Sequence, residues 1–374
     1  MSLRLHQLVL HSAQAALRLQ AQDGSFPAGH NGPRRQKETP LRNTGYWLIT
    51  LLRAFQWTGE SKFRKSATLA AGYLLSEVHR PGRATFLHRT SRAVDQCNGL
   101  IGQAWTLEAL LAAAEQLESE EHFALAQHVF DLHPFDEEKG LWHSVEVDGE
   151  DQGICQTLNQ QIWFAAMGSR LAQTSGGSGT AKVNRFQQRL AEHLGLDGTG
   201  LIIHRLSEDP GPRPAIRRLK RRLGDWLRRA EAGRLALGYH AFNLAGLCRF
   251  SPQRARRSLG KLPGVERALT CLEEPTIHAR LYHNGFSYGY NPVGFEMALA
   301  LETWPAESQM GPMAWVSEQL RLTFDWRTLM MTRGSTDAMT LAARIYEATL
   351  LPDYNLEPIE PGPLGRTPQF GNDP

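Results

Sequence analysis

Apolar helical stretches alternate with amphipathic ones along nearly the whole chain, and this alternation limits the possible folds more than any other feature of the sequence. Apolar residues recur at helical spacing in most segments of the 374 residues. Only 86–88, 141–147 and 201–204 look extended, and the turn chemistry of Asp148-Gly149 predicts a small hairpin over 145–154. The sequence therefore predicts an all-α fold.

The predicted helices form two sets. One set is rich in Trp, Leu, Ala and Gly and is apolar nearly all round, which is typical of buried helices. We predict these inner helices at 41–58, 99–118, 158–174, 239–250, 291–303 and 335–350. The other set has a charged face, as expected of helices that cover a core from outside, and is predicted at 2–20, 61–78, 120–132, 180–194, 253–273 and 307–323.

Helical hairpins that cannot bury their apolar faces alone must stack on one another. Six outer–inner pairs can stack as an open arc or close into a ring, and the lack of an obvious terminal cap favours the ring. We therefore predict one (α/α)6 barrel, a six-hairpin toroid, over 1–355, with an inserted basic helix at 214–231 and an extended C-terminal tail over 356–374.

Composition excludes several classes of protein. A formal net charge of +3, with no basic stripe interleaved with RNA-type aromatic motifs, argues against a nucleic-acid partner. No apolar run approaches the roughly 20 residues of a membrane span, and the N-terminus lacks signal-peptide features. The four cysteines are widely spaced, so we expect free thiols in a cytoplasmic protein without a metal or another cofactor.

Polar and aromatic side chains collect where the predicted inner helices begin. Because these helices should run parallel, their starts should meet at one end of the ring. The residues there are Asp95 and Asn98 at the second helix, Asn159, Gln160 and Gln161 at the third, Tyr239, His240 and Asn243 at the fourth, Tyr288, Tyr290, Asn291 and Glu296 at the fifth, and Arg333 and Asp337 at the sixth.

These residue types suit a sugar. Hydroxyl groups need amide and carboxylate partners, and the C–H faces of a sugar ring pack on aromatic rings. Converging helix N-termini also favour an anion, such as the carboxylate of a uronic acid. We predict catalytic roles for Asp95, Glu296, His240 and Tyr290, and substrate binding by the others. The alternative for several residues, including Asn98, Asn159, Asn291 and Asp337, is simple helix capping.

Two runs resemble a known group of enzymes. Residues 95–105, Asp-Gln-Cys-Asn-Gly-Leu-Ile-Gly-Gln-Ala-Trp, and 156–164, Gln-Thr-Leu-Asn-Gln-Gln-Ile-Trp-Phe, resemble unsaturated glucuronyl hydrolases of the six-hairpin glycosidase superfamily. The runs at 133–136, 238–243, 290–296 and 343–347 are more similar to proteins of glycan-assembly clusters that are linked to hexuronic acids. The resemblance spans about 20–355 and implies a protein that acts on a uronate-containing glycan or polysaccharide, as part of its biosynthesis.

The resemblance has one departure. The hydrolases use two aspartates, each ahead of an inner helix. Asp95 matches the first, whereas Cys155 stands where the second would fall.

Three hypotheses follow for the chemistry. Glycoside hydrolysis needs an acid with a raised pKa and a second carboxylate, and Asp95, Glu296 and Asp337 are the candidates; Asp95 alternatively caps its helix or pairs with Arg92. Epimerisation at C5 or elimination would use the amides at 159–161 to neutralise a uronate, and Tyr or His side chains as acid and base. The third hypothesis is glycan binding without catalysis. A separation of about 5–10 Å between two carboxyl groups would favour hydrolysis.

The stretch 213–234 carries nine basic residues and only Asp225 and Glu231 as acids, with its apolar residues on one helical face. Such a helix is typical of contact with an anionic membrane surface or an acidic glycan. The alternative is that the apolar face packs on the ring and the arginines are solvated.

Overall fold

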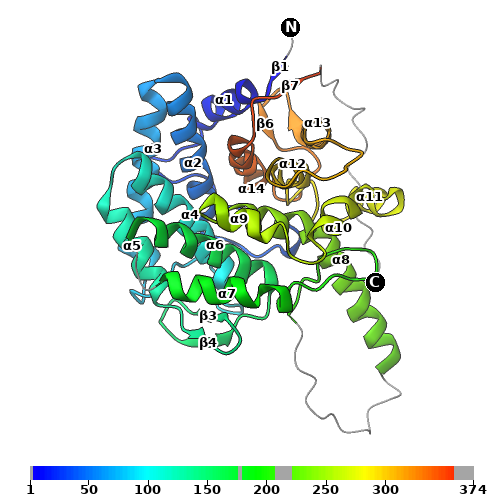
Figure 1. The fold of residues 1–374 in the computed structure, drawn as a ribbon. Helices are drawn as coiled ribbons and strands as arrows, with labels where there is room; N and C mark the ends of the chain where they lie inside the picture. The colour runs from blue at the N-terminus through cyan, green and yellow to red at the C-terminus, as the bar shows by residue number, and fades with distance from the viewer. Residues whose placement is uncertain (1–2, 176–178, 207–220, 358–374) are drawn as a thin grey trace.

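The computed structural model describes residues 3–175, 179–206 and 221–357, and it confirms the all-α, six-hairpin ring. Each inner helix packs against the next one, and the last packs back on the first, so the ring is closed (Figure 1). The inner helices are α2 (Leu41–Thr58), α4 (Gly99–Gln116), α6 (Leu158–Ser175), α8 (Arg221–Cys248), α12 (Val293–Thr303) and α14 (Ala338–Ala343), which continues as the 3-10 helix η5 (Arg344–Leu350).

The outer helices cover the ring, and each packs beside a neighbouring inner helix. α4 shows why the two sets differ: every residue from Gly99 to Ala113 is buried, whereas α3 buries only one face. The outer helices are α1 (Leu5–Ala16), α3 (Ser61–Leu75), α5 (Glu120–Asp131), α7 (Gly179–His193), α9 (Gln253–Leu259), α10 (Val265–Thr270) and α13 (Pro312–Thr323), with α11 (Pro275–Leu281) and the 3-10 turns η1 (Gly32–Arg34), η2 (Glu77–His79) and η4 (Cys271–Glu273) in connections.

Short strands tie the connections together. The predicted hairpin forms from β3 (Leu141–Val145) and β4 (Asp151–Ile154), and β2 (Phe135–Asp136) adds to β3. β5 (Phe324–Asp325) pairs with β6 (Met330–Met331), and β1 (Leu3–Arg4) pairs antiparallel with β7 (Asn355–Leu356). The predicted tail falls, from residue 358 on, outside the described residues.

The basic stretch is not a separate helix where the structure describes it. α8 runs without a break from Arg221 into the predicted inner helix at 239–250, and its first half projects beyond the ring (Figure 1). The predicted break at 232–238 contains Gly233 and Gly238, but a glycine costs a helix only about 1 kcal/mol and does not end it. Residues 207–220 lie outside the described residues, and so do the side chains of 221–229.

Two other predicted helices differ in extent. The helix predicted over 253–273 is interrupted between α9 and α10, because the chain turns at Pro263 and at Gly264, whose φ is +86°. The helix predicted from 307 begins at Pro312, in the first turn where proline fits best.

Aromatic packing fixes the spacing of the inner helices near the site. Trp163 of α6 stacks on Phe242 of α8 at 4.6 Å, and its Nε1 donates to the carbonyl oxygen of Phe242 at 3.0 Å. A Cβ at Gly246 would lie 2.8 Å from the Trp163 ring, so this approach requires glycine. Among the described residues, no helix is long and apolar enough to cross a bilayer.

Candidate active-site cavity

A cavity of about 840 Å³ lies where α4, α6 and α12 begin, beside the middle of α8. Of the residues predicted from the sequence, Asp95, Asn98, Asn159, Gln160, Tyr239, Tyr290 and Asn291 line it. The cavity is also lined by residues that were not predicted for the site, among them Arg34, Arg89, Trp105, His204, Arg205, Glu231 and Phe242.

On the α4 side, Arg89 organises the wall. Its guanidinium donates from Nη1 to Asp95 and from Nη2 to Oδ1 of Asn98. Asn98 has a left-handed backbone (φ 57°) and its side chain makes no capping bond, so the amide is turned to Arg89 instead of to its own helix. The carboxylate of Glu146 accepts the backbone N–H groups of Gln96 and Cys97, each at 2.9 Å, and so holds this loop on the β3–β4 hairpin.

On the α6 side, the amide of Gln160 reaches the start of α4. Its Oε1 accepts from the backbone N–H of Ile101 at 3.4 Å and from the thiol of Cys155 at 3.3 Å. A Cβ at Gly99 would lie 2.3 Å from this oxygen, so glycine is required there. The cysteine at the departure from the hydrolase pattern thus holds a side chain of the cavity wall.

On the α8 side, His204 stacks on Tyr239 with ring centroids 4.8 Å apart. In the described part of the chain, neither ring nitrogen of His204 has a hydrogen-bond partner, and Nδ1 is buried. Burial, together with the charges of Arg34 and Arg205, lowers the pKa of His204 to about 4, so the imidazole is neutral at neutral pH. Burial raises the pKa of Tyr239, which therefore stays a neutral phenol.

Tyr290 closes the wall between α12 and α2. Its hydroxyl donates to Oδ1 of Asn31 at 2.7 Å and accepts from Nη1 of Arg42 at 3.2 Å. Arg42 is fully buried, packs on the ring of Trp105 at 3.9 Å and faces Glu38 at 3.5 Å. Tyr290 is therefore held from both sides by groups of the first inner helix and the connection before it.

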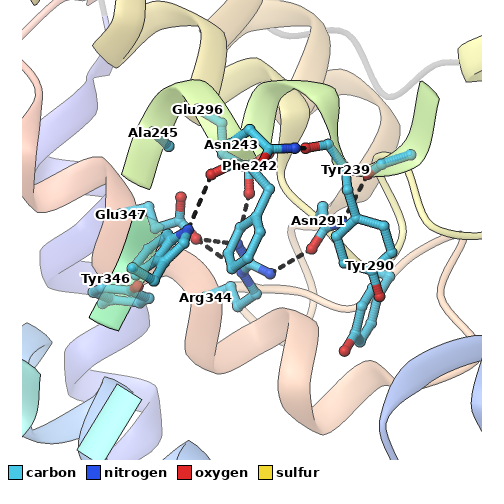
Figure 2. Close-up of polar contacts among 12 residues, drawn as sticks. Tyr239, Phe242, Asn243, Ala245, Tyr290, Asn291, Glu296, Arg344, Tyr346 and Glu347 are labelled. Atoms are coloured by element: carbon cyan, nitrogen blue, oxygen red, sulfur yellow. Dashed lines mark hydrogen bonds and ion pairs between the residues drawn. The ribbon is translucent and has the colours of Figure 1, made fainter. Parts of the chain in front are cut away.

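Beneath the cavity lies a buried cluster of charged side chains. Figure 2 shows Arg344 between Asn291 and the two carboxylates of Glu296 and Glu347. Arg344 also packs against the ring of Phe242, at 5.2 Å, which lines the cavity. The cluster supports the cavity floor through Asn291 and Phe242.

Glu296 was predicted as a catalytic acid, and the structure places it outside the cavity wall. Burial, with Glu347 nearby, raises the pKa of Glu296 to about 8, which is the shift that a general acid needs. However, its side chain is 0% exposed and its Oε1 accepts from Arg344 at 2.6 Å. Glu296 lies in the first turn of α12, below the residues that reach the cavity.

His240, also predicted as catalytic, lies outside the cavity wall. Its Nδ1 accepts from the backbone N–H of Ile202 at 3.0 Å, and its Nε2 donates to the carbonyl oxygen of Ala268 at 2.7 Å. Both nitrogens are occupied in a fully buried side chain, so His240 ties the connection before α8 to α10.

The other predicted residues outside the cavity wall also hold the scaffold. Gln161 bonds both backbone groups of Trp142, and Asn243 donates to the carbonyl oxygen of Tyr239 at 2.7 Å. Tyr288 donates to Glu318 at 2.5 Å. Arg333, after β6, is not among the lining residues.

Asp337 shows the capping alternative. It accepts from the backbone N–H of Thr340 at the start of α14, and its other oxygen accepts from those of His30 and Gly32 at 3.0 Å. These bonds lower the pKa of Asp337 although burial opposes the shift, so the carboxylate is ionised and occupied.

The lining carboxylates are Asp95 and Glu231, and each is paired with an arginine. Asp95 pairs with Arg89, and Glu231 pairs with Arg234 at 2.8 Å. Neither is the buried, unpaired carboxyl group that a general acid requires.

The missed residues share one signal. Arg34, Arg89, His204 and Arg205 lie in the connections that lead into inner helices, as Asp95, Asn98 and Tyr290 do. A prediction that included every polar residue of these connections would have identified these four residues. Trp105 lies further inside α4, and nothing in the sequence distinguishes it from the other buried tryptophans.

No family model matches this chain. Over 365 residues it is 40% identical to "Archaeal glycosylation protein Q" of Haloferax volcanii, and the match covers 94% of this chain and 98% of that protein.

Solved structures share the fold. A cellobiose 2-epimerase from Spirochaeta thermophila aligns with a TM-score of 0.57 and 13% identity, over 92% of this chain and 96% of that one. The unsaturated glucuronyl hydrolase of Bacillus sp. GL1 gives 0.56 and 14%, again over 92% and 96%. A D-mannose isomerase gives 0.59 and 11%, over the same shares of the two chains. At these identities the likeness shows a common ring architecture.

Proposed function

The chain belongs to the family of archaeal glycosylation protein Q, and from that premise we propose that it is a carbohydrate-active protein of glycan assembly that acts on a uronate-containing oligosaccharide. The cavity walls supply what sugar rings need. Amide groups of Asn31, Asn159 and Gln160 suit hydroxyl groups, and the rings of Trp105 and Phe242 suit C–H faces.

The charge of the cavity suits an acidic sugar. Arg34, Arg89 and Arg205 line it against Asp95 and Glu231, and Glu231 has a partner in Arg234 outside the lining residues. A guanidinium can hold a carboxylate with two parallel hydrogen bonds. A uronate would be neutralised best beside Arg34 and Arg205, next to His204.

The chemistry that the site supports best is proton transfer at the carbon that carries the carboxylate. Neutral His204 takes the proton from C5, and the electron pair moves into the carboxylate, where Arg34 and Arg205 stabilise the added charge. Return of a proton from solvent to the opposite face of C5 gives the epimer, and the imidazolium of His204 releases its proton to solvent. Departure of the oxygen at C4, which takes the proton from the imidazolium of His204, instead gives the unsaturated uronate and a free hydroxyl group.

The single observation that carries this proposal is the state of His204. It is a neutral imidazole in the cavity wall, without hydrogen-bond partners among the described residues and with two arginines beside it. Hydrolysis by a pair of carboxyl groups has less support, since the two lining carboxylates are both ion-paired and Glu296 and Asp337 lie elsewhere. Binding without turnover remains the third hypothesis, and the same experiment tests it.

The experiment is incubation of the protein with glucuronate-containing oligosaccharides in D2O or H2(18)O, followed by mass spectrometry and NMR. We expect deuterium at C5, or an unsaturated product, and we expect His204→Phe to abolish it, because phenylalanine keeps the ring stack on Tyr239 and removes both nitrogens. His128→Asn, on the exposed face of α5, is the control. Entry of 18O without deuterium would show hydrolysis, and binding without either label would show a non-catalytic glycan-binding protein; both results reject the proposal.

A further inference from the structure

The cavity has two sides of different chemistry, supplied by different parts of the ring. Arg89, Asn98 and Trp105 come from α4 and the connection before it, whereas His204, Arg205 and Tyr239 come from α8 and the connection before that. The start of α6 lies between them, since α6 packs against both α4 and α8.

The α4 side offers hydrogen-bond donors without acceptors. Among the described residues, Nδ2 of Asn98, Nε1 of Trp105 and Nε of Arg89 are buried and have no hydrogen-bond partner. Asn98 and Trp105 are 3% and 4% exposed, yet both line the cavity. An unpaired buried donor costs about 1–3 kcal/mol, so several of them at one wall indicate a ligand that brings oxygen acceptors.

The charges on the α4 side are balanced. Asp95 neutralises Arg89, and buried Glu38 faces Arg42 behind the Trp105 ring. The donors of Asn98 and Trp105 are uncharged, and that of Arg89 belongs to a neutralised ion pair. This side therefore fits an uncharged sugar, whose hydroxyl and ring oxygens accept hydrogen bonds.

Among the described residues, the charges on the α8 side are unbalanced. Arg34 and Arg205 are both exposed at the cavity, and no ion pair of either one exists within the residues that the structure describes. The nearby carboxylate, Glu231, is taken by Arg234. Arg34 and Arg234 both lie over the ring of Phe286, at 5.6 and 5.1 Å, so the guanidinium that pairs with Glu231 is the third on this side.

We infer that the cavity binds two adjacent sugars in one orientation, an acidic sugar on the α8 side and an uncharged sugar on the α4 side. The inference rests on the proposed function and makes its substrate specific: the reacting uronate is joined to a neutral sugar that occupies the α4 side. The volume of about 840 Å³ is in the upper part of the range for small-ligand sites and leaves room for more than one ring.

The test measures binding alone, by calorimetry in the His204→Phe variant, so that no turnover intervenes. Three probes are compared: a glucuronate-containing disaccharide with a neutral second sugar, glucuronate alone, and the same disaccharide with its carboxyl group reduced to an alcohol. We expect the disaccharide to bind more tightly than either of the other two.

Two variants separate the two sides. Trp105→Phe keeps the ring against Arg42 and removes only the unpaired donor, so it should weaken the disaccharide about 2- to 10-fold and leave glucuronate alone unchanged. Arg34→Gln with Arg205→Gln should weaken both acidic probes by about 10-fold or more and leave the carboxyl-reduced disaccharide unchanged.

Asn98→Asp is a second variant for the α4 side, because aspartate tolerates the left-handed backbone and removes the Nδ2 donors. It should reproduce the effect of Trp105→Phe. If the α4 variants weaken glucuronate as much as the disaccharide, or the arginine variants weaken the reduced probe equally, the two-sided assignment is wrong. Absence of binding of every probe would instead reject the proposed function itself.

Discussion

The guanidinium of Arg344 donates to Oδ1 of Asn291 at 2.7 Å, while Nδ2 of Asn291 donates to the carbonyl oxygen of Gly238 at 2.8 Å. The residue after Gly238 is Tyr239, on the α8 side of the cavity. One buried cation thus links the last inner element to the connection before α12 and, through Asn291, to the middle of α8; Figure 2 shows the contact of Arg344 with Asn291.

Replacement of Arg344 should destabilise the whole ring. Arg344→Lys keeps the charge but loses the fork that bonds Asn291, Glu296 and Glu347 together. We expect a loss of about 3–5 kcal/mol in the free energy of unfolding, measured in urea, because Glu347, Asn291 and Glu296 lose buried hydrogen bonds to the guanidinium. Arg327→Lys, whose side chain is 87% exposed, is the control and should change stability by less than about 1 kcal/mol. Equal effects of the two changes would contradict this account of the cluster.

Glu296 should make stability fall as pH rises. The folded state raises its pKa from 4.5 to about 8, so between these values the folded protein binds more protons than the unfolded one, and each increase in pH favours unfolding. Glu296→Gln keeps an oxygen for Arg344 and has no proton to lose. The difference in urea midpoint between variant and parent should therefore grow from about pH 5 to pH 8 and then level off. Glu60→Gln, in an exposed pair with Lys62, should give a flat difference; a flat difference for Glu296→Gln would show that this carboxyl group is ionised in the folded protein.

In a pH profile of the proton-transfer reaction, kcat/KM should fall on the acid side near pH 4 (the acid limb). Since the pKa of His204 is lowered to about 4, its basic form is complete at neutral pH, and kcat/KM should be constant from about pH 5.5 to 8. Arg34→Gln removes a positive charge that opposes protonation, so the limb should move to higher pH. Lys37→Gln, an exposed residue of the same connection, should leave the limb in place. If neither substitution shifts the acid limb of the kcat/KM profile, His204 is not the base.

Gly294 should be essential for the contact of α12 with α13. A Cβ there would lie 2.2 Å from the backbone oxygen of Trp315 and 2.6 Å from Cβ of Gln319. We expect Gly294→Ala to cost about 1–3 kcal/mol, as overpacked cores do, measured by chemical unfolding. Gly72→Ala in α3 meets nothing within 4 Å and should instead stabilise by about 0.5–1 kcal/mol. A stable Gly294→Ala variant would mean that the two helices can move apart at little cost.

Sequence reasoning worked where burial alone decides the structure. The apolar helices became the inner ring and the amphipathic ones the outer layer, since a helix without a polar face must be surrounded. It failed where one or two residues decide. The apolar periodicity predicted one helix through Pro263 and Gly264, where the structure has a turn. It also predicted a break near Gly233 and Gly238, where the structure has a continuous helix. Local propensity is weak, and tertiary contacts determine which glycine becomes a turn.

The same limit applies to the cavity. The starts of parallel helices did locate it, because a closed ring brings them to one end. Residues adjacent in sequence nevertheless have different positions. Gln160 lines the cavity whereas Gln161 bonds Trp142, and Tyr239 lines the cavity whereas His240 faces α10. Adjacent helical residues point about 100° apart, so the rotation of each helix decides the role. That rotation depends on contacts far apart in sequence, such as Trp163 with Phe242.

The pairing of β1 with β7 places Leu3 opposite Leu356, and the neighbouring contacts of α1 and η5 complete the same seam. The last joint of the ring therefore joins segments separated by almost the whole chain, which is the slowest kind of contact to form. During synthesis the first hairpins must wait, with one flank uncovered, until the last one has emerged. The seam also brings residues 3 and 356 side by side, so a short linker between these strands and a cut in an exposed connection would give a circularly permuted ring with its inner order unchanged.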